Sequence, residues 1–122
     1  MTEIAITDNK TIEEIQSEFS SHFSFLKIEF YEAEHSSGEG TPETLRVHVK
    51  KTIGAARTKH VAGKLSIHGN QKVSTLEKAF HDDYGLNVQV FRRSGNLWLQ
   101  TTATDDWTLS EQNETAKDFS LE

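Results

Sequence analysis

The sequence of 122 residues contains no cysteine. This absence excludes disulfide bonds, thiolate-ligated zinc, iron–sulfur clusters and cysteine nucleophiles. Apolar runs are short, and none approaches the roughly 20 residues of a transmembrane helix. Residues 1–6 also lack the basic segment and long apolar stretch of a secretory signal. We therefore expect a cytoplasmic protein without a membrane partner.

Proline occurs once, and hydrophobic residues make up 34% of the chain against 26% charged residues. These proportions are typical of a polar globular protein and not of a collagenous or disordered chain. A chain of this length fits one domain, so we expect a single domain over residues 1–122. Glycine, serine and Pro42 predict a mobile loop at residues 35–44, and the tail at residues 117–122 is predicted to fray.

An internal repeat organises the hydrophobic pattern. Residues 3–31 can be laid over residues 64–91, with one residue skipped, so that apolar positions coincide. The matched pairs are Ile4 with Leu65, Ile6 with Ile67, Ile12 with Val73, Ile15 with Leu76, Phe19 with Phe80, Leu26 with Leu86, Ile28 with Val88 and Phe30 with Val90. In each copy the apolar period changes from alternation to helical spacing and back. Each copy is therefore predicted to form a strand, a helix and a second strand.

Hydroxyl and carboxylate pairs mark the expected helix starts. Three of them have the spacing of a capping box, namely Thr11 with Glu14, Ser74 with Glu77, and Thr108 with Glu111. In this motif each side chain satisfies a backbone N–H at the first turn. Gly85 is expected to end the second helix, and the helix after Thr108 to end at about Ala116. Residues 45–63 are predicted to hold a short strand or irregular piece followed by one or two helical turns.

Two β-α-β repeats joined head to tail predict an α+β fold. The expected architecture is a two-layer sandwich, ferredoxin-like or related, in which two helices cover one face of four antiparallel strands. A hairpin with its tip at Ser94-Gly95 adds a C-terminal strand, followed by the short helix. This hairpin register sets Phe91 opposite Trp98 and directs Leu97 and Leu99 toward the core.

Two stretches in the C-terminal half are distinctive: YGLNVQVFRRSGN at residues 84–96 and TDDWTL at residues 104–109. They resemble segments of a small bacterial protein family of unknown function. The resemblance covers mainly residues 84–109. It implies no activity and no site residue for this chain.

Protein binding is the leading functional hypothesis. One face of the predicted hairpin carries aromatic side chains flanked by arginines, and both residue types are favoured anchors at interfaces. The candidate binding residues are Tyr31, Phe91, Arg92, Arg93 and Trp98. They predict a non-enzymatic module that holds a protein partner or a second copy of itself.

Nucleic-acid binding is an alternative, because the charges are unevenly distributed. Residues 44–76 contain no aspartate or glutamate but many cations, among them Arg46, Lys50, Lys51, Arg57, Lys59 and Lys64. Such a segment can neutralise phosphates and release their counterions. It can also neutralise the acidic remainder of the same molecule or of a second subunit. Binding of a polyanion through residues 46–72 is thus one hypothesis.

Catalytic signatures are absent from the sequence. It contains no Gly-x-Ser-x-Gly elbow, no His-Glu-x-x-His helix and no phosphate loop. We expect no catalytic residue, no metal and no cofactor. An enzyme that uses Asp105 and Asp106, or the cluster at residues 81–83, is the remaining alternative, because paired carboxylates can divide acid and base roles.

Overall fold

The computed structural model describes residues 2–32 and 45–120, and it confirms the α+β class. The elements are β1 (Thr2–Ile6), α1 (Ile12–His22), β2 (Leu26–Tyr31), α2 (Ile53–Ala56), β3 (Gly63–Ile67), α3 (Val73–Tyr84), β4 (Asn87–Ser94), β5 (Leu97–Gln100), the 3-10 turn η2 (Thr102–Thr104) and α4 (Leu109–Ser120). The loop predicted at residues 35–44 lies outside the described residues.

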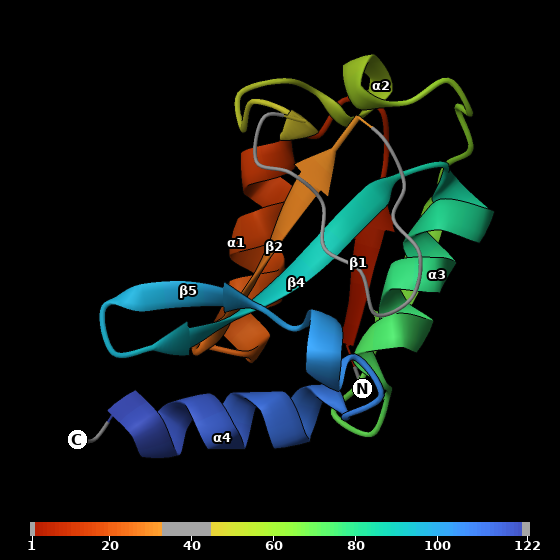
Figure 1. The fold of residues 1–122 in the computed structure, drawn as a ribbon. Coiled ribbons are helices and arrows are strands. Elements are labelled where there is room, and N and C mark those ends of the chain that lie inside the picture. The colour runs from red at the N-terminus through yellow and green to blue at the C-terminus, as the bar shows by residue number, and fades with distance from the viewer. Residues whose placement is uncertain (1, 33–44, 121–122) are drawn as a thin grey trace.

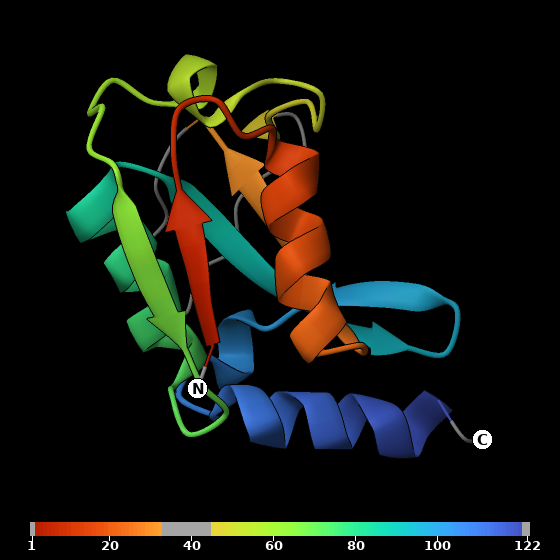
Figure 2. The same ribbon diagram turned by 180° about the vertical axis from the view of Figure 1, so that it is seen from behind.

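The described strands form two antiparallel sheets. One sheet pairs β1 with β3, and the other has the order β2-β4-β5. The first strand of each β-α-β unit thus joins one sheet and the second strand joins the other, whereas a ferredoxin-like arrangement has one four-stranded sheet. Helices α1 and α3 flank the sheets on opposite sides (Figure 1), and the view from behind shows β1 beside β3 (Figure 2).

Both ladders pair a strand with its counterpart from the other unit. The β1–β3 ladder is centred on Ile4 opposite Leu65, which are matched positions of the two repeats. In the repeat Ile28 is matched to Val88 and Phe30 to Val90. In the β2–β4 ladder the partners are exchanged, because Ile28 lies opposite Val90 and Phe30 lies opposite Val88. A local two-fold axis therefore relates the two units. In Figure 1 it exchanges α1 with α3, and α2 at one end with α4 at the other.

The same symmetry extends to the segments that follow each unit. Two pairs of backbone hydrogen bonds join each helix start to its returning chain at equivalent places. They are Ile12 N to Lys51 O (2.9 Å) and Ile53 N to Lys10 O (2.7 Å) in the first unit, and Val73 N to Trp107 O (3.0 Å) and Leu109 N to Gln71 O (2.9 Å) in the second. Helix α2 is a single turn, in agreement with the one or two helical turns expected within residues 45–63.

Glycine permits a close crossing of chains in both units. A Cβ atom on Gly54 would lie 3.0 Å from the Cβ of Asp8, and one on Gly69 would lie 2.0 Å from the Oγ of Ser110. Gly54 is equivalent to Ser110, and Asp8 is equivalent to Gly69. At each crossing one of the two segments contributes a glycine. In the first unit it is Gly54, in the segment that returns after the unit, and in the second unit it is Gly69, in the segment before the helix.

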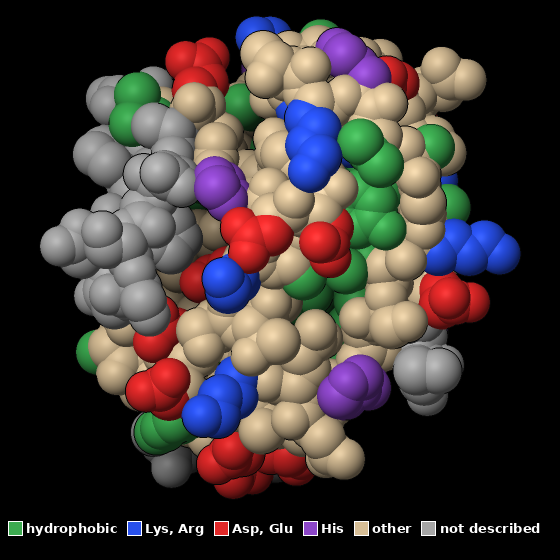
Figure 3. Space-filling model, turned by 90° about the vertical axis from the view of Figure 1, so that its right-hand side faces the viewer, with side chains coloured by type: hydrophobic (Ala, Val, Ile, Leu, Met, Phe, Trp, Pro, Cys, Tyr) green, Lys and Arg blue, Asp and Glu red, His purple; other side chains and the backbone are tan. Residues whose placement is uncertain are grey.

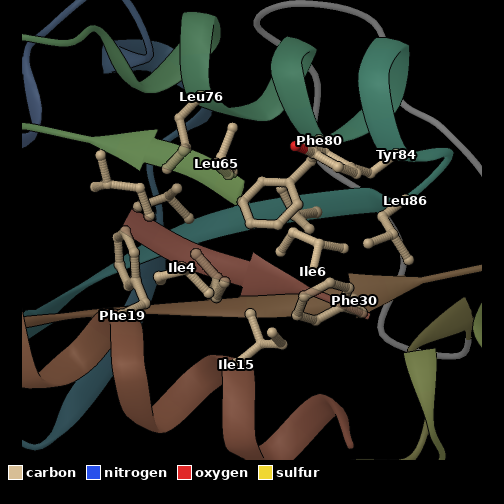
Figure 4. Packing of buried hydrophobic residues seen from close by; sticks show 14 of the residues in the cluster. Ile4, Ile6, Ile15, Phe19, Phe30, Leu65, Leu76, Phe80, Tyr84 and Leu86 are labelled. Carbon is tan, nitrogen blue, oxygen red and sulfur yellow. The ribbon is translucent and has the colours of Figure 1, made fainter. Parts of the chain in front are cut away.

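The two units share one hydrophobic core. Ile15 and Phe19 of α1 point toward the sheets from one side, and Leu76 and Phe80 of α3 point toward them from the other (Figure 4). All four side chains are buried, as is Ile4 of β1. Burial of such a side chain contributes about 1.5–3 kcal/mol relative to exposure. Each helix packs on the strands of its own unit, and Phe80 of α3 also meets Phe30 of β2 edge to face with ring centroids 5.8 Å apart, so that the core joins the two units.

Two of the three predicted capping boxes are present. The Glu14 N–H donates to Thr11 Oγ1 (3.2 Å), and the Thr11 N–H donates to Glu14 Oε1 (3.3 Å). Thr108 and Glu111 make the same reciprocal pair at 3.1 Å each. Helix α4, which Thr108 precedes, continues to Ser120, beyond the end predicted at about Ala116.

The capping box predicted for the second helix is wrong. Helix α3 begins after Lys72, which makes no side-chain cap, and Glu77 is buried. The carboxylate of Glu77 instead accepts a hydrogen bond from the backbone N–H of Val90 (2.9 Å). At the other end of α3, Gly85 has a φ of 66° and closes the helix as predicted.

The predicted hairpin register is shifted by two residues. Trp98 pairs with Arg93, and the turn consists of Gly95 and Asn96, with a φ of 59° at Gly95. A glycine with positive φ at the first central position suits a type II′ turn, whose twist matches that of a hairpin. A shift of two leaves every side chain on its expected face, because the strand period is two.

The leucines of β5 do not reach the core. Leu97 is 66% exposed and Leu99 is 40% exposed, although both were expected to be buried. The hairpin of β4 and β5 projects beyond the body of the fold on the side of α4 (Figure 1). The core ends before the strand does. Within the described part of the chain, no helix is both long and apolar enough to span a membrane.

The shared core predicts that equivalent substitutions in the two units have similar effects. Phe19→Ala and Phe80→Ala should each lower the free energy of unfolding by about 3–5 kcal/mol, because each leaves a cavity in the same core. Urea denaturation measures this, and Leu97→Ala is the exposed control, with an expected change within about 0.5 kcal/mol. A small effect at either phenylalanine would contradict a common core.

Candidate functional site

The residues predicted for protein binding do not form one exposed surface. Tyr31 is 2% exposed and Phe91 is 5% exposed, so both lie beneath the surface of the three-stranded sheet. Trp98, in contrast, is 38% exposed. All three aromatic residues were candidates for the binding surface. Only the tryptophan is available for contact with another molecule.

Cations cover the buried aromatic ring. The Lys27 Nζ lies 5.2 Å from the ring centroid of Phe91 and 5.0 Å from that of Trp98, and the guanidinium of Arg46 lies 5.7 Å from Phe91. Such contacts are attractive because the face of an aromatic ring is electronegative. Lys27 therefore joins the two aromatic side chains and holds one face of Trp98.

The two arginines have different roles. Arg92 donates from Nη1 to Thr104 Oγ1 (3.1 Å) and to Gln112 Oε1 (3.0 Å), and it stacks on Trp107 at 5.6 Å. These contacts tie β4 to α4 and make Arg92 a structural residue. The side chain of Arg93 is exposed beside Trp98, and its Nε donates to the neighbouring carbonyl of Gly95 (3.0 Å).

Exposed apolar side chains are concentrated on β5. The large exposed hydrophobic residues of the described chain are Val61, Leu97, Trp98, Leu99 and Trp107, and the middle three are consecutive. The face of α3 is different, because apolar atoms there form a narrow stripe among charges of both signs (Figure 3). The leucines were missed because the alternating pattern suits a buried strand. The Leu-Trp-Leu run, apolar on both faces, is the signal that could have revealed them.

The outer edge of β2 is covered by side chains of α1. Gln16 donates from Nε2 to the Ile28 carbonyl (2.8 Å), and the Ser20 hydroxyl donates to the Leu26 carbonyl (3.0 Å). Residues 45–47 continue this cover along the same edge through backbone hydrogen bonds. A further strand cannot add there without displacing these contacts.

The part of β4 that β5 leaves open is covered as well. Glu77 accepts from the Val90 N–H, and Thr101 donates to the Val90 carbonyl from both its N–H (3.2 Å) and its hydroxyl (3.0 Å). Glu77 and Gln16 occupy equivalent positions on α3 and α1. The two helices therefore protect the edges of their strands in similar ways.

The edge of β5 is different, because this strand pairs only with β4 in the described sheet. In an antiparallel hairpin closed by a two-residue turn, hydrogen-bonded and non-hydrogen-bonded pairs alternate from the turn outward. The backbone N–H and C=O groups of Leu97 and Leu99 therefore point toward β4. This alternation agrees with the hydrogen bond from the Thr101 N–H to the Val90 carbonyl, two residues further along. The N–H and C=O of Trp98 point away from β4, toward the free edge.

An open groove of 390 Å³ lies beside Trp98. Its lining residues are Gln16, Ser17, Ser20, Ser24, Leu26, Lys27, Glu29, Val49 and Trp98. The amide of Gln16 and the hydroxyl of Ser20 are already engaged with β2, and Lys27 forms an ion pair with Glu29 (3.3 Å). The groove thus extends the exposed face of Trp98, and several of its polar side chains are engaged within the chain.

Most cations predicted for nucleic-acid binding are engaged within the chain. The contacts are Arg46 with Glu29 (3.3 Å), Lys50 with Glu13 (2.7 Å), Arg57 with Asp8 (2.9 Å) and Lys59 with the Asp82 carbonyl (2.8 Å). Lys51 and Lys64 are exposed. The basic segment thus neutralises acidic groups of the same molecule, and nucleic-acid binding stays a prediction without a specific observation in its favour.

The acidic groups of the enzyme hypothesis are not brought together. Residues 81–83 lie at the C-terminal end of α3, whereas Asp105 lies at its N-terminal end, where its carbonyl accepts from the Ser74 N–H (2.8 Å). Hydrogen bonds from His81 and then from Lys78 lower the pKa of Asp82. A carboxylate held in its ionised form is poorly suited to act as a general acid.

A cluster that the sequence did not reveal joins Asp8, Arg57 and His60. The Asp8 carboxylate accepts from Arg57 Nε (3.1 Å) and Nη2 (2.9 Å), and its other oxygen lies 2.8 Å from His60 Nδ1. Arg57, with only 1% of its side chain exposed, also donates to the Tyr84 carbonyl (2.9 Å). The cluster ties the chain between α2 and β3 to the rest of the fold.

The electrostatics of this cluster also indicate a structural role. Hydrogen bonds from Arg57, and then those from His60, hold the pKa of Asp8 below its ordinary value against an opposing effect of burial. The carboxylate is therefore a weak base. In the described chain, no group of three or more histidine, aspartate or glutamate side chains is arranged to hold a metal ion.

Comparisons with protein-family models, with curated proteins and with solved structures found no match to this chain.

The Asp8 cluster predicts an acid-sensitive component of stability. Because the pKa of Asp8 is lowered in the folded protein, the unfolded chain binds the proton first as the pH falls. Asp8 should therefore stabilise the fold above about pH 4, and this contribution should be lost as the pH falls further. Asp8→Asn should be less stable at pH 7 and lose less stability on acidification. Urea denaturation at a series of pH values measures both, with Asp118→Asn as the exposed control. Equal acid dependence in Asp8→Asn and the unsubstituted protein would contradict this role.

Proposed function

We propose that this chain is a non-enzymatic protein-interaction module that accepts an extended strand along the free edge of β5. The observation that supports the proposal most strongly is the combination found at Trp98. Its backbone N–H and C=O point away from β4, and its side chain and those of Leu97 and Leu99 are exposed. An exposed apolar edge strand is a site at which another strand can add.

Strand addition uses two kinds of contact that β5 can supply. Main-chain hydrogen bonds provide affinity, and side chains that alternate between the two faces provide specificity. On one face, Trp98 beside the exposed Arg93 forms an aromatic and cationic pair of the kind enriched in binding hot spots. On the other face, Leu97 and Leu99 offer apolar area to a partner strand.

The rest of the sheet supports the same interpretation. The edge of β2 is covered by Gln16, by Ser20 and by residues 45–47, and the open part of β4 is covered by Glu77. Charged side chains commonly protect exposed edges, yet β5 carries none. An unprotected strand in a sheet whose other edges are protected is consistent with use as a contact.

A peptide copied from β5 tests the proposal. A labelled peptide of residues 95–102 should bind the full-length chain and shift the backbone NMR resonances of β5, because the peptide presents both main-chain groups and apolar side chains. Fluorescence anisotropy measures the affinity. Trp98→Ala in the chain should weaken binding at least tenfold, which corresponds to about 1.4 kcal/mol.

Val61→Ala is the matched control, because Val61 is also exposed and lies outside the hairpin. This variant should bind the peptide as the unsubstituted chain does. A peptide methylated at alternate backbone nitrogens, which removes edge-facing donors, should bind more weakly. Absence of peptide binding, or equal losses in the two variants, would contradict the assignment of β5.

A further inference from the structure

We infer that the strand accepted by β5 is the β5 of a second copy of this chain, in a symmetric antiparallel dimer. This inference rests on the proposed function, because it requires that the edge accept a strand. It adds the identity of the partner and the register. A dimer of this kind joins two three-stranded sheets into one continuous sheet.

Charge favours a second copy at this edge over most other places on the surface. The chain has a net charge of −6, so that two copies repel one another when acidic surfaces approach. Residues 94–104 contain no charged side chain. Two hairpins that meet along β5 thus bring this uncharged stretch of one chain against the same stretch of the other. No like charges then lie directly opposite each other.

Geometry favours a two-fold axis at Trp98. When such an axis relates two identical antiparallel strands, a given side chain lies on the same face of the joined sheet in both copies. Residues that lie opposite each other are then both odd-numbered or both even-numbered. Centred on Trp98, the register lets the two Trp98 residues exchange both main-chain hydrogen bonds, since these groups face the free edge. Leu97 then lies opposite Leu99 of the partner subunit. Apolar side chains thus meet on both faces.

The interior of the molecule already contains this type of pairing. β1 pairs with its counterpart β3 about the matched residues Ile4 and Leu65, and β2 pairs with its counterpart β4 in a register that exchanges matched positions. Like strands of this sequence therefore pair symmetrically inside one chain. The proposed dimer repeats the same antiparallel two-fold contact between chains.

Charge exchange on the two leucines tests the dimer. The unsubstituted chain should show a monomer–dimer equilibrium in sedimentation at increasing concentration. L97K/L99K and L97E/L99E should each raise the dissociation constant at least tenfold, because like charges then face each other across the axis. An equimolar mixture of the two variants should restore association, because each lysine then lies opposite a glutamate.

Two controls accompany this experiment. Circular dichroism and urea denaturation establish that both variants fold, and the pair V61K and V61E carries the same charges at another exposed position. The Val61 variants should dimerise as the unsubstituted chain does. Dimers that persist in both leucine variants would show another interface and would overturn the inference.

A single cysteine tests the register, because the chain has no other. Cα atoms in a hydrogen-bonded antiparallel pair lie about 5.5 Å apart, which is within the range of a disulfide. Trp98→Cys should therefore form a covalent dimer under mild oxidation, and Val61→Cys should not. The oxidation is carried out at a concentration at which sedimentation shows the Trp98→Cys variant itself to be dimeric, and failure to cross-link there would overturn the register.

The outcomes separate this inference from the proposed function. If the full chain stays monomeric and the mixed variants do not associate, while the β5 peptide still binds, the second copy is excluded and strand acceptance stands. If neither the peptide nor a second chain binds, both proposals fail.

Discussion

The strands of the two β-α-β units pair with each other and not within a unit, and this constraint determines the arrangement of the fold. The first strands of the two units pair with each other, and so do the second strands, which places Phe19 of α1 and Phe80 of α3 in one core. Burial of these side chains supplies the main driving force, because the hydrophobic effect is roughly proportional to the apolar area removed from water. The folded state therefore requires both units at once.

Because the two strands of each unit lie in different sheets, the sheets have edge strands. The backbone groups of these edges are not equally covered. Gln16 of α1 and Glu77 of α3 use equivalent positions to bond the backbone of their neighbouring strands. Strand β5, which pairs with the C-terminal part of β4, lies outside this symmetric body and carries exposed apolar side chains. The symmetric part thus provides the stable framework, and the proposed contact lies on an addition to one unit.

The sequence predicted the elements better than it predicted their partners. Apolar periods located the strands and helices, and Thr11 and Thr108 marked two helix starts, because these signals are local. Sheet pairing is not local: alternation at Ile4 and Ile6 indicates a strand without indicating its neighbour. The hairpin register was missed because a shift of two residues leaves every side chain on the same face. The burial of Phe91 depends on Lys27 and Arg46, which only the folded chain brings over its ring.

Native-state hydrogen exchange tests most directly whether the two units depend on each other. Amide exchange of α1, α3 and the four strands β1–β4 is followed by NMR at increasing denaturant concentration. The shared core predicts that the slowest amides of both units open with one free energy, equal to that of global unfolding. Exchange of the α1 unit through a lower-energy opening, while the α3 unit stays protected, would contradict this account.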